Sequence, residues 1–188
     1  MSHQSIWFDT QLPSDIINIL SEDIKKFDKD CVSSVVGNGP KSRADETIRK
    51  SNNAWIPASH WVYGFVWCYL FNANDGNFHY DLNGFDGNQL QYTHYDIGDF
   101  YNWHHDTIAK NNPEENIRKL SVVVQLSDPE EYEGGNLELI SVIDERYVAP
   151  RKKGTVIVFD SRTKHRVTKI RSGHRRSIVG WATGPHWK

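Results

Sequence analysis

Apolar residues near the start of the chain recur at helical spacing. In residues 12–27, LPSDIINILSEDIKKF, apolar side chains return every three or four positions, at Ile16, Ile17, Leu20, Ile24 and Phe27. Ser14 precedes this run, and serine is a favoured residue at the N-cap of a helix. We therefore predict an amphipathic helix over residues 12–27 that is capped by Ser14.

A second helix is predicted after a polar segment. Residues 37–53, GNGPKSRADETIRKSNN, are rich in turn formers and are interpreted as a loop. In IPASHWVYGFVWCYLFNAN, which follows, Pro57 suits a first helical turn. Trp61, Phe65 and Tyr69 then fall four residues apart on one helical face. Residues 12–75 are thus predicted to form a helical support for the rest of the chain.

From Asn77 the pattern changes to short segments bounded by Gly, Asn and Asp. Many of their residues are β-branched or aromatic, which favours at least six strands. The segments are FHYDL, LQYTHYDI, FYNWHHD, KLSVVVQLS, NLELI, GTVIVFDS, HRVTKI and RRSIVGWAT.

Helices followed by a run of short strands predict a mainly β fold. The expected architecture is a sandwich or barrel with the N-terminal helices packed on one face. The chain has no linker rich in Pro, Gly or Ser and no internal repeat. Residues 1–188 are therefore predicted to form a single domain, with the β core at about 77–185.

Composition and charge exclude some classes of protein. Lysines and arginines number 22 against 24 acidic residues, a net charge of −2, so no strong field favours a nucleic acid partner. The segment MSHQSIWFDTQ lacks the features of a signal peptide, and no apolar run approaches the about 18 to 20 residues that span a bilayer. The two cysteines, Cys31 and Cys68, show no metal-ligand spacing, and Cys68 is expected to be buried. A cytoplasmic location is expected.

The segment DFYNWHHDT, residues 99–107, carries the first candidate chemistry. Residues i and i+2 of a strand point to the same face, so His104 and Asp106 would aim an imidazole and a carboxylate at one point. His165, directly after the apolar strand TVIVF, offers a third ligand. Two histidines and one carboxylate leave open positions that favour non-haem iron(II), although zinc also accepts these ligands. His105 would face away from this point.

A second group of residues favours an organic co-substrate. In GHRRSIVGW, four residues alternate onto one face of a strand: Arg175, Ser177, Val179 and Trp181. A guanidinium matches a carboxylate with two parallel hydrogen bonds, so Arg175 and Ser177 would hold the far carboxylate of a diacid. Trp181 would close the mouth of the pocket, and Arg176 would face away. A zinc hydrolase has no use for such a buried arginine.

Three linked motifs resemble the prolyl 4-hydroxylase branch of the iron(II)/2-oxoglutarate dioxygenases. YDIGDFYNWHHD is similar to the Tyr-x-x-Gly-x-x-Tyr-x-x-His-x-Asp signature of that branch. DPEEYEGGNLEL resembles its acidic turn and Gly-Gly strand, and FDSRTKHRVTKIRSGHRRSIVGW resembles its distal-histidine block. The motifs occur in the expected order through the strand-rich part of the chain, which makes the resemblance specific.

The resemblance implies a double-stranded β-helix, or jelly-roll, core with iron(II) held by His104, Asp106 and His165. It implies that Arg175 pairs with 2-oxoglutarate, where the animal collagen enzymes use lysine. The other site residues that it implies are Tyr95, facing the co-substrate, Gln125, where some relatives place a co-substrate-contacting tyrosine, and Tyr101, Trp181 and Arg118 on the substrate side. Dioxygen would be the second co-substrate, and the family often uses ascorbate to restore oxidised iron.

The reaction implied is hydroxylation of an unactivated C–H bond, coupled to decarboxylation of 2-oxoglutarate to succinate. The family suggests a prolyl residue in a peptide or protein as substrate, or a free amino acid. The polar residues 37–53 and the segment after Asp106 are expected to form a lid. Three alternatives stay open: a nucleic-acid demethylase, which the near-neutral charge disfavours, a non-catalytic jelly-roll that binds sugar or protein, and a zinc hydrolase.

Overall fold

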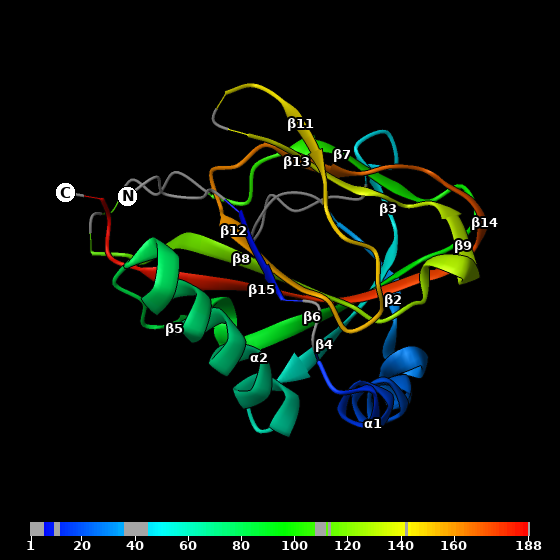
Figure 1. Ribbon diagram of the computed structural model, residues 1–188, viewed down its shortest axis with the longest axis horizontal. Coiled ribbons are helices and arrows are strands. Elements are labelled where there is room, and N and C mark those ends of the chain that lie inside the picture. The colour runs from blue at the N-terminus through cyan, green and yellow to red at the C-terminus, as the bar shows by residue number, and fades with distance from the viewer. Residues whose placement is uncertain are drawn as a thin grey trace.

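The computed structural model describes residues 6–9, 12–35, 45–107, 112, 114–141 and 143–187, and Figure 1 shows its two main β-sheets facing each other. Both helices lie against the outer face of the larger sheet (Figure 1). These helices are α1 (Ser14–Ile24) and α2 (Trp61–Ala73). Short helical turns cover Lys25–Asp30, Asn74–Phe78, Asp86–Asn88 and Pro129–Glu131.

Every strand pairing in the described part of the chain is antiparallel. In spatial order the larger sheet contains β1 (Ile6–Asp9), β12 (Val156–Asp160), β8 (Ile117–Gln125), β15 (Arg175–Gly184), β6 (Gln89–Tyr95), β4 (Asn52–Pro57) and β2 (Val32–Ser33), while β5 (Gly84–Phe85) pairs with β15. The smaller sheet contains β11 (Arg146–Val148), β10 (Leu137–Ile140), β13 (His165–Val167), β7 (Phe100–His104) and β3 (Arg49–Lys50). A separate pair joins β14 (Ile170–Gly173) to β9 (Tyr132–Gly134).

The central strands of the larger sheet separate two hydrophobic clusters. Val122 and Val124 of β8 pack with the buried faces of α1 and α2, whereas Val123 belongs to the cluster between the sheets. The alternation follows from the strand period of two. Both faces of β8 and β12 are covered, so nearly every residue of these two strands is buried. The predicted jelly-roll with helices on one face is confirmed, and the division of the chain into domains stays a prediction.

The first helix differs from the prediction at both ends. Helix α1 begins at Ser14 itself, Pro13 occupies the N-cap, and no side chain caps the helix. The chain then tightens into a 3-10 turn over Lys25–Asp30. Ile17, Leu20 and Ile24 are buried as the pattern indicated, but Ile16 is 38% exposed.

The segment before the second helix was wrongly assigned. Asn52–Pro57 forms β4, so Pro57 ends a strand rather than starting a helix. Proline is tolerated there because β2 pairs only with the first residues of β4 and leaves Pro57 at an open edge. Helix α2 begins four residues later, where His60 Nδ1 accepts a hydrogen bond from Val62 N at 3.3 Å.

Two other predictions in this half of the chain were wrong. The predicted loop 37–53 ends in strand structure, since Arg49–Lys50 is β3 and β4 begins at Asn52. The predicted strand FHYDL is not formed: Phe78 ends a π-helical turn, and no strand covers residues 79–83. The lid expected from residues 37–53 and from the segment after Asp106 falls largely on 36–44 and 108–111, which lie outside the described residues.

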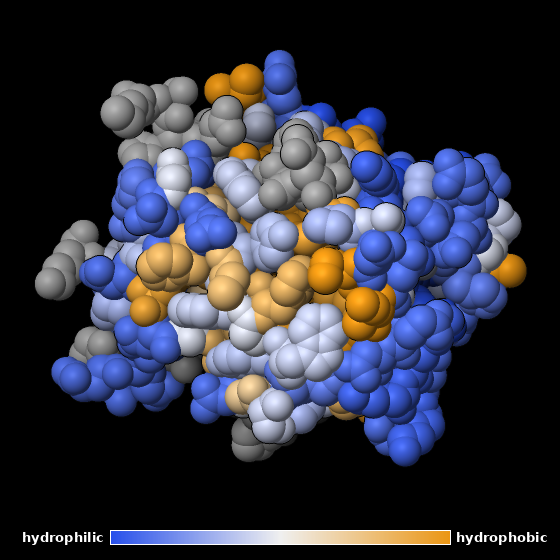
Figure 2. Space-filling model, turned by 60° about the horizontal axis from the view of Figure 1, so that its bottom comes forward, coloured by the Kyte–Doolittle hydropathy of each residue, from blue (hydrophilic) through white to orange (hydrophobic). Residues whose placement is uncertain are grey.

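An aromatic row runs along helix α2 at the border between core and solvent. The ring centroids of Trp61, Phe65 and Tyr69 are 5.9 and 5.2 Å apart. Trp61 is exposed, whereas Phe65 and Tyr69 are half-buried against the core, and Leu70 faces the sheet. Figure 2 shows that apolar side chains gather across this helical face between polar margins. Cys68 is exposed, contrary to expectation, and both cysteines are free. None of the described helices combines the length and apolar character that crossing a bilayer requires.

The packing of α2 on the sheet predicts a contrast between adjacent residues. Leu70 is fully buried, whereas its neighbour Phe71 is 52% exposed. Leu70→Ala should lower the free energy of unfolding by about 2 to 5 kcal/mol, because it leaves a cavity between helix and sheet. Phe71→Ala, the matched control, should change it by no more than about 0.5 kcal/mol. Urea unfolding followed by circular dichroism measures both, and equal losses would contradict the assigned helix face.

Candidate metal centre

The smaller sheet brings two histidines and one aspartate together. His104 is the last residue of β7, and His165 is the first residue of β13, its direct partner across the antiparallel pair (Figure 1). Asp106 follows β7 by two residues. Its Oδ2 lies 3.3 Å from His165 Nε2, and its Oδ1 lies 3.6 Å from His104 Nε2. One ligand atom from each residue lies within 4.8 Å of the others, so the three can hold one ion.

Backbone carbonyls determine which ring nitrogen carries the hydrogen in each neutral imidazole. His104 Nδ1 lies 2.7 Å from the carbonyl oxygen of Asn102, and His165 Nδ1 lies 2.9 Å from that of Thr163. A carbonyl oxygen only accepts, so each Nδ1 carries the hydrogen and donates it. In the neutral ring Nε2 is then the lone-pair atom, and both Nε2 atoms point at Asp106. This second set of hydrogen bonds is typical of metal-ligating histidines.

The Asp106 carboxylate is buried and is held in place by hydrogen bonds. Asp106 is 7% exposed, and Ser121 Oγ donates to its Oδ2 at 2.7 Å. Its backbone N–H donates to the carbonyl of Ser161 at 2.9 Å. These contacts come from β8 and from the turn after β12, both in the larger sheet. Asp106 itself follows β7 of the smaller sheet, so both sheets set the position of its carboxylate.

The electrostatics of the group favour an anionic aspartate between imidazoles. Burial, and next the neighbouring His165, lower the pKa of His104 to about 3, so that ring is neutral. Burial also opposes a charge on His165, but the Asp106 carboxylate outweighs it and raises the pKa of His165. Burial likewise opposes a charge on Asp106, and the charge and hydrogen bond of His165 lower the pKa of Asp106. The donor set of two nitrogens and one anionic oxygen fits a divalent cation with open coordination positions.

Aromatic rings fix the orientation of both imidazoles. Tyr101 stacks on His104 with ring centroids 3.5 Å apart and an interplanar angle of 14°. Phe159 meets His165 edge-on at 4.8 Å. Tyr101 is itself covered by Arg49, whose Cζ lies 4.7 Å from the ring centroid. Burial raises the pKa of Tyr101 to about 12, so its hydroxyl stays neutral.

Arg175 lies in the same pocket, on the opposite sheet. It is the first residue of β15, is 1% exposed, and pairs across the strands with Tyr95 of β6. Its Nη2 donates to Gln125 Oε1 at 2.9 Å, and its Cζ lies 5.5 Å from the Tyr95 ring centroid. No carboxylate among the described residues pairs with it. A buried, uncompensated guanidinium is costly, so this end of the pocket fits an anionic ligand.

Two buried polar atoms, one of Arg175 itself and one of Ser177, strengthen that fit. Within the described part of the chain, Arg175 Nε and Ser177 Oγ have no hydrogen-bond partner, although both are shielded from solvent. Buried polar groups are normally paired, so unpaired ones that line a pocket are available to a ligand. Arg176 lies on the other face of β15, as predicted, with Nη2 3.7 Å from Asp28 Oδ2.

A larger cavity of about 430 Å³ adjoins the pocket at Asp106, Tyr101 and Trp181. Trp181 is 8% exposed, its Nε1 has no partner, and Arg118 Cζ lies 4.1 Å from its ring centroid. Arg118 in turn pairs with Asp86 at 2.7 Å. His105 also lines this cavity, while its Nδ1 contacts the carbonyl of Arg162 at 2.7 Å, so its ring lies outside the His–Asp–His group.

Sequence reasoning missed eight residues that line this cavity. They are Arg49, Asn53, Trp55 and Gln91, together with Val32, Ser33, Ser34 and Val35. The first three lie in β3 and β4, in the region assigned to a loop and a helix start. The alternation in NNAWIP was the available signal, but Pro57 directed the interpretation toward a helix.

Comparison with known proteins supports this geometry. Residues 90–183, half of the chain, match the model of the 2OG-Fe(II) oxygenase superfamily. A PKHD-type hydroxylase of Parvibaculum lavamentivorans is 44% identical over 62 residues, which cover 33% of this chain and 28% of that protein. The chain spans less than half the length of the curated relatives that it matches.

Two solved structures share the fold. A prolyl-4-hydroxylase of Pseudomonas putida superposes with a TM-score of 0.74 at 20% identity, covering 97% of this chain and 94% of that one. A prolyl hydroxylase of Trichoplax adhaerens, in complex with a hypoxia inducible factor peptide fragment, superposes with a TM-score of 0.75 at 18% identity, covering 95% and 83%. At these identities the likeness concerns the fold. The family match, together with the His–Asp–His group, shows that the chain belongs to the 2OG-Fe(II) oxygenase superfamily.

Proposed function

We propose that the chain is an iron(II)- and 2-oxoglutarate-dependent hydroxylase that acts on a prolyl residue of a peptide or protein. The observation that carries the proposal is that His104, Asp106 and His165 face a buried Arg175 across one pocket. The first three residues supply a cation site, and the fourth supplies a fixed positive charge for a second anionic group. A ligand that both chelates a metal and carries a distant carboxylate satisfies both ends.

The metal would be held by the two Nε2 atoms and the Asp106 carboxylate. Iron bound there supplies oxidative decarboxylation of 2-oxoglutarate with dioxygen, giving succinate, carbon dioxide and a hydroxylated carbon. The protein orients the ligands through the carbonyls of Asn102 and Thr163 and through Ser121. Ascorbate is expected to sustain turnover by keeping the iron reduced.

The far carboxylate of 2-oxoglutarate would bind Arg175 and Ser177. Arg175 Nε and Ser177 Oγ have no hydrogen-bond partner among the described residues, so they can donate to a ligand. Arg175 Nη2 donates a hydrogen bond to Gln125 Oε1, which holds the guanidinium in place. The Tyr95 ring lies beside the guanidinium and excludes water from it.

The substrate would enter through the 430 Å³ cavity. Trp55, Tyr101 and Trp181 give it aromatic walls, and an uncharged pyrrolidine ring suits such a surface. The peptide held by the Trichoplax enzyme and the name of the Pseudomonas enzyme support a proline-containing chain over a free amino acid. The near-neutral net charge supports a peptide over a nucleic acid.

A substrate screen tests the proposal directly. Purified protein with iron(II), 2-oxoglutarate and ascorbate is incubated with proline-containing peptides, free amino acids or short methylated DNA. Succinate release with the mass gain of one oxygen atom on a peptide is the expected result. The same gain on a free amino acid, or loss of a methyl group from the DNA with release of formaldehyde, would redirect the substrate class. No succinate under any condition would favour a non-catalytic binding protein.

Removing one ligand should abolish turnover and metal binding at this group. His165→Ala leaves His104 and Asp106, and two protein ligands hold a metal poorly. Succinate release should fall to background, and the iron content measured by a colorimetric chelator should fall by the equivalent that this group holds. His105→Ala is the matched control, because its ring lies outside the group, and it should retain iron. Wild-type iron content in His165→Ala would remove His165 from the site.

Loss of the Arg175 guanidinium should mainly weaken the binding of 2-oxoglutarate. Arg175→Ala should raise the apparent KM for 2-oxoglutarate by the equivalent of about 2 to 5 kcal/mol, the cost of removing a buried charged partner. Iron binding should persist. Arg175→Lys keeps the charge and should recover part of the affinity. Arg176→Ala, on the outer face of the same strand, is the control, and a KM shift there instead would relocate the carboxylate site.

A change in the exposed wall of the cavity should alter the KM for the peptide alone. Trp55→Ala removes an indole that is 46% exposed and lines the cavity, so folding should be little affected. We expect a higher KM for the peptide, with the KM for 2-oxoglutarate unchanged. Trp61→Ala on α2 is the control, since that indole is 45% exposed but lies outside the cavity. Steady-state kinetics with varied peptide decide, and an unchanged peptide KM would place the substrate elsewhere.

A further inference from the structure

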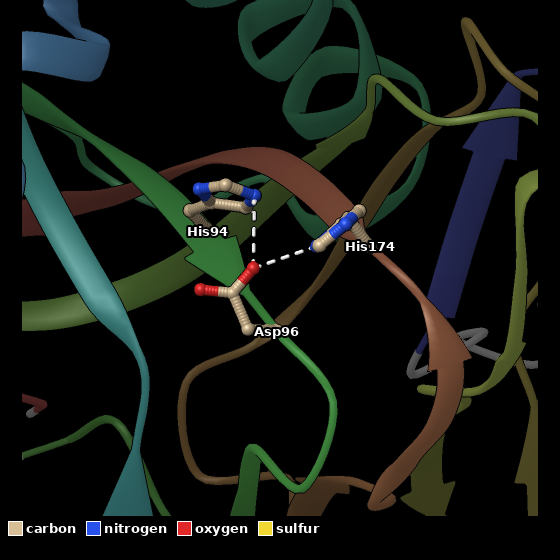
Figure 3. A group of neighbouring side chains, drawn as sticks. All are labelled: His94, Asp96 and His174. Carbon is tan, nitrogen blue, oxygen red and sulfur yellow. Dashed lines mark hydrogen bonds and ion pairs between the residues drawn. The ribbon is translucent and has the colours of Figure 1, made fainter.

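A second His–Asp–His group lies at the end of the larger sheet. His94 belongs to β6, Asp96 follows that strand, and His174 lies between β14 and β15 (Figure 3). Asp96 Oδ1 lies 2.6 Å from His174 Nδ1 and 3.6 Å from His94 Nε2. Figure 3 shows both rings directed at this one oxygen. One ligand atom from each residue lies within 4.8 Å of the others.

This group is separate from the pocket on the inner face. Across β6 and β15, Tyr95 pairs with Arg175, and the next residues, His94 and Arg176, form the adjacent pair. Successive residues point to opposite faces of a strand. The His94 ring therefore lies on the face away from the proposed co-substrate site. An ion bound here would connect the end of β6 to the start of β15 on the outer face of the larger sheet.

The position of the group is set by the surrounding backbone. The backbone N–H of Asp96 donates to Asp99 Oδ2 at 3.0 Å, which holds the turn that carries the carboxylate. The His94 side chain is 19% exposed, and its Nε2 is shielded from solvent and has no hydrogen-bond partner among the residues that the structure describes. A hydrogen bond between His174 and Asp96 explains that pair alone. It leaves His94 Nε2 unsatisfied, and coordination to a cation would satisfy it.

Other charges near the group are balanced. Arg176 and Asp28 are the neighbouring charged side chains, and Arg176 Nη2 lies 3.7 Å from Asp28 Oδ2. The positive charge of Arg176 is thus partly compensated, and Asp96 adds a negative charge at the centre. The His174 side chain is 63% exposed, so its ring is free to adjust to ligand distances of about 2.0 to 2.2 Å around a metal.

We propose that His94, Asp96 and His174 bind a divalent transition-metal cation, with zinc as the ion that fits best. Two imidazoles and one carboxylate are ligands that zinc accepts in tetrahedral sites, with water in the fourth position. Magnesium and calcium prefer oxygen ligands and fit less well. This site depends on its own geometry and is independent of the function proposed above.

Zinc titration of the metal-free chain tests the proposal. By isothermal titration calorimetry the wild-type protein should bind two equivalents of Zn²⁺, one in each His–Asp–His group. His174→Ala should bind one equivalent tightly. The affinity for the second equivalent should fall by at least about 10- to 100-fold, because loss of a mere outer-shell partner already costs a metal site that much. The double variant His104→Ala/His165→Ala should keep one equivalent, and adding His174→Ala to it should remove that binding.

Control variants distinguish zinc bound by this group from zinc bound by histidines elsewhere on the chain. His79→Asn removes an exposed imidazole at a left-handed position that asparagine tolerates, and it should retain both equivalents. His94→Gln, a second ligand change, should reproduce the loss seen with His174→Ala. A single equivalent in the wild type, or a second equivalent indifferent to both ligand changes, would overturn the proposal. Succinate release should persist in His174→Ala, so failure of the hydroxylase proposal would show separately, as absence of succinate from the wild type.

Discussion

The register between β7 and β13 is the constraint on which the rest of the site depends. His165 stands directly opposite His104, and a slip of one residue would turn the His165 side chain to the other face of the sheet. β13 is three residues long, so its register is fixed from both sides: Leu139 of β10 pairs with His165, and Tyr101 of β7 pairs with Val167 after an irregular step. The two histidines proposed as metal ligands are therefore positioned by sheet pairing and by the backbone carbonyls that orient their rings.

The alternation of strand residues gives the larger sheet two separate sets of polar groups. Arg175 and Ser177 face the pocket between the sheets, whereas Arg176 and His94 lie on the outer face. One short stretch of antiparallel pairing thus carries both the proposed co-substrate clamp and the proposed zinc site. A change that moves the end of β6 would be felt on both faces, because Tyr95 and His94 are adjacent.

Strand parity predicted which residues of β15 face the pocket, since Arg175 and Ser177 share one face of that strand. It does not explain Asp106, which lies beyond the end of β7 and is held by contacts with Ser121 and Ser161 from distant segments. The strand β4 was missed because Pro57 imitates a helix start, whereas its pairing with distant β6 decides the structure. The group at Asp96 was missed for a similar reason: His174 lies 78 positions away in the sequence, and only the fold brings the two side chains together.

The buried polar atoms that lack partners show where the fold departs from ordinary packing rules. Three of them, Arg175 Nε, Ser177 Oγ and Trp181 Nε1, belong to residues that line the pocket beside the His–Asp–His group. Each costs stability in the unliganded protein, and an interior built only for stability would pair them or replace them with apolar groups. The larger sheet tolerates them because the apolar cluster under α1 and α2 carries the packing on its other face. The inner face of the larger sheet is thereby free to hold donors for the proposed diacid and substrate, opposite the proposed metal ligands of the smaller sheet.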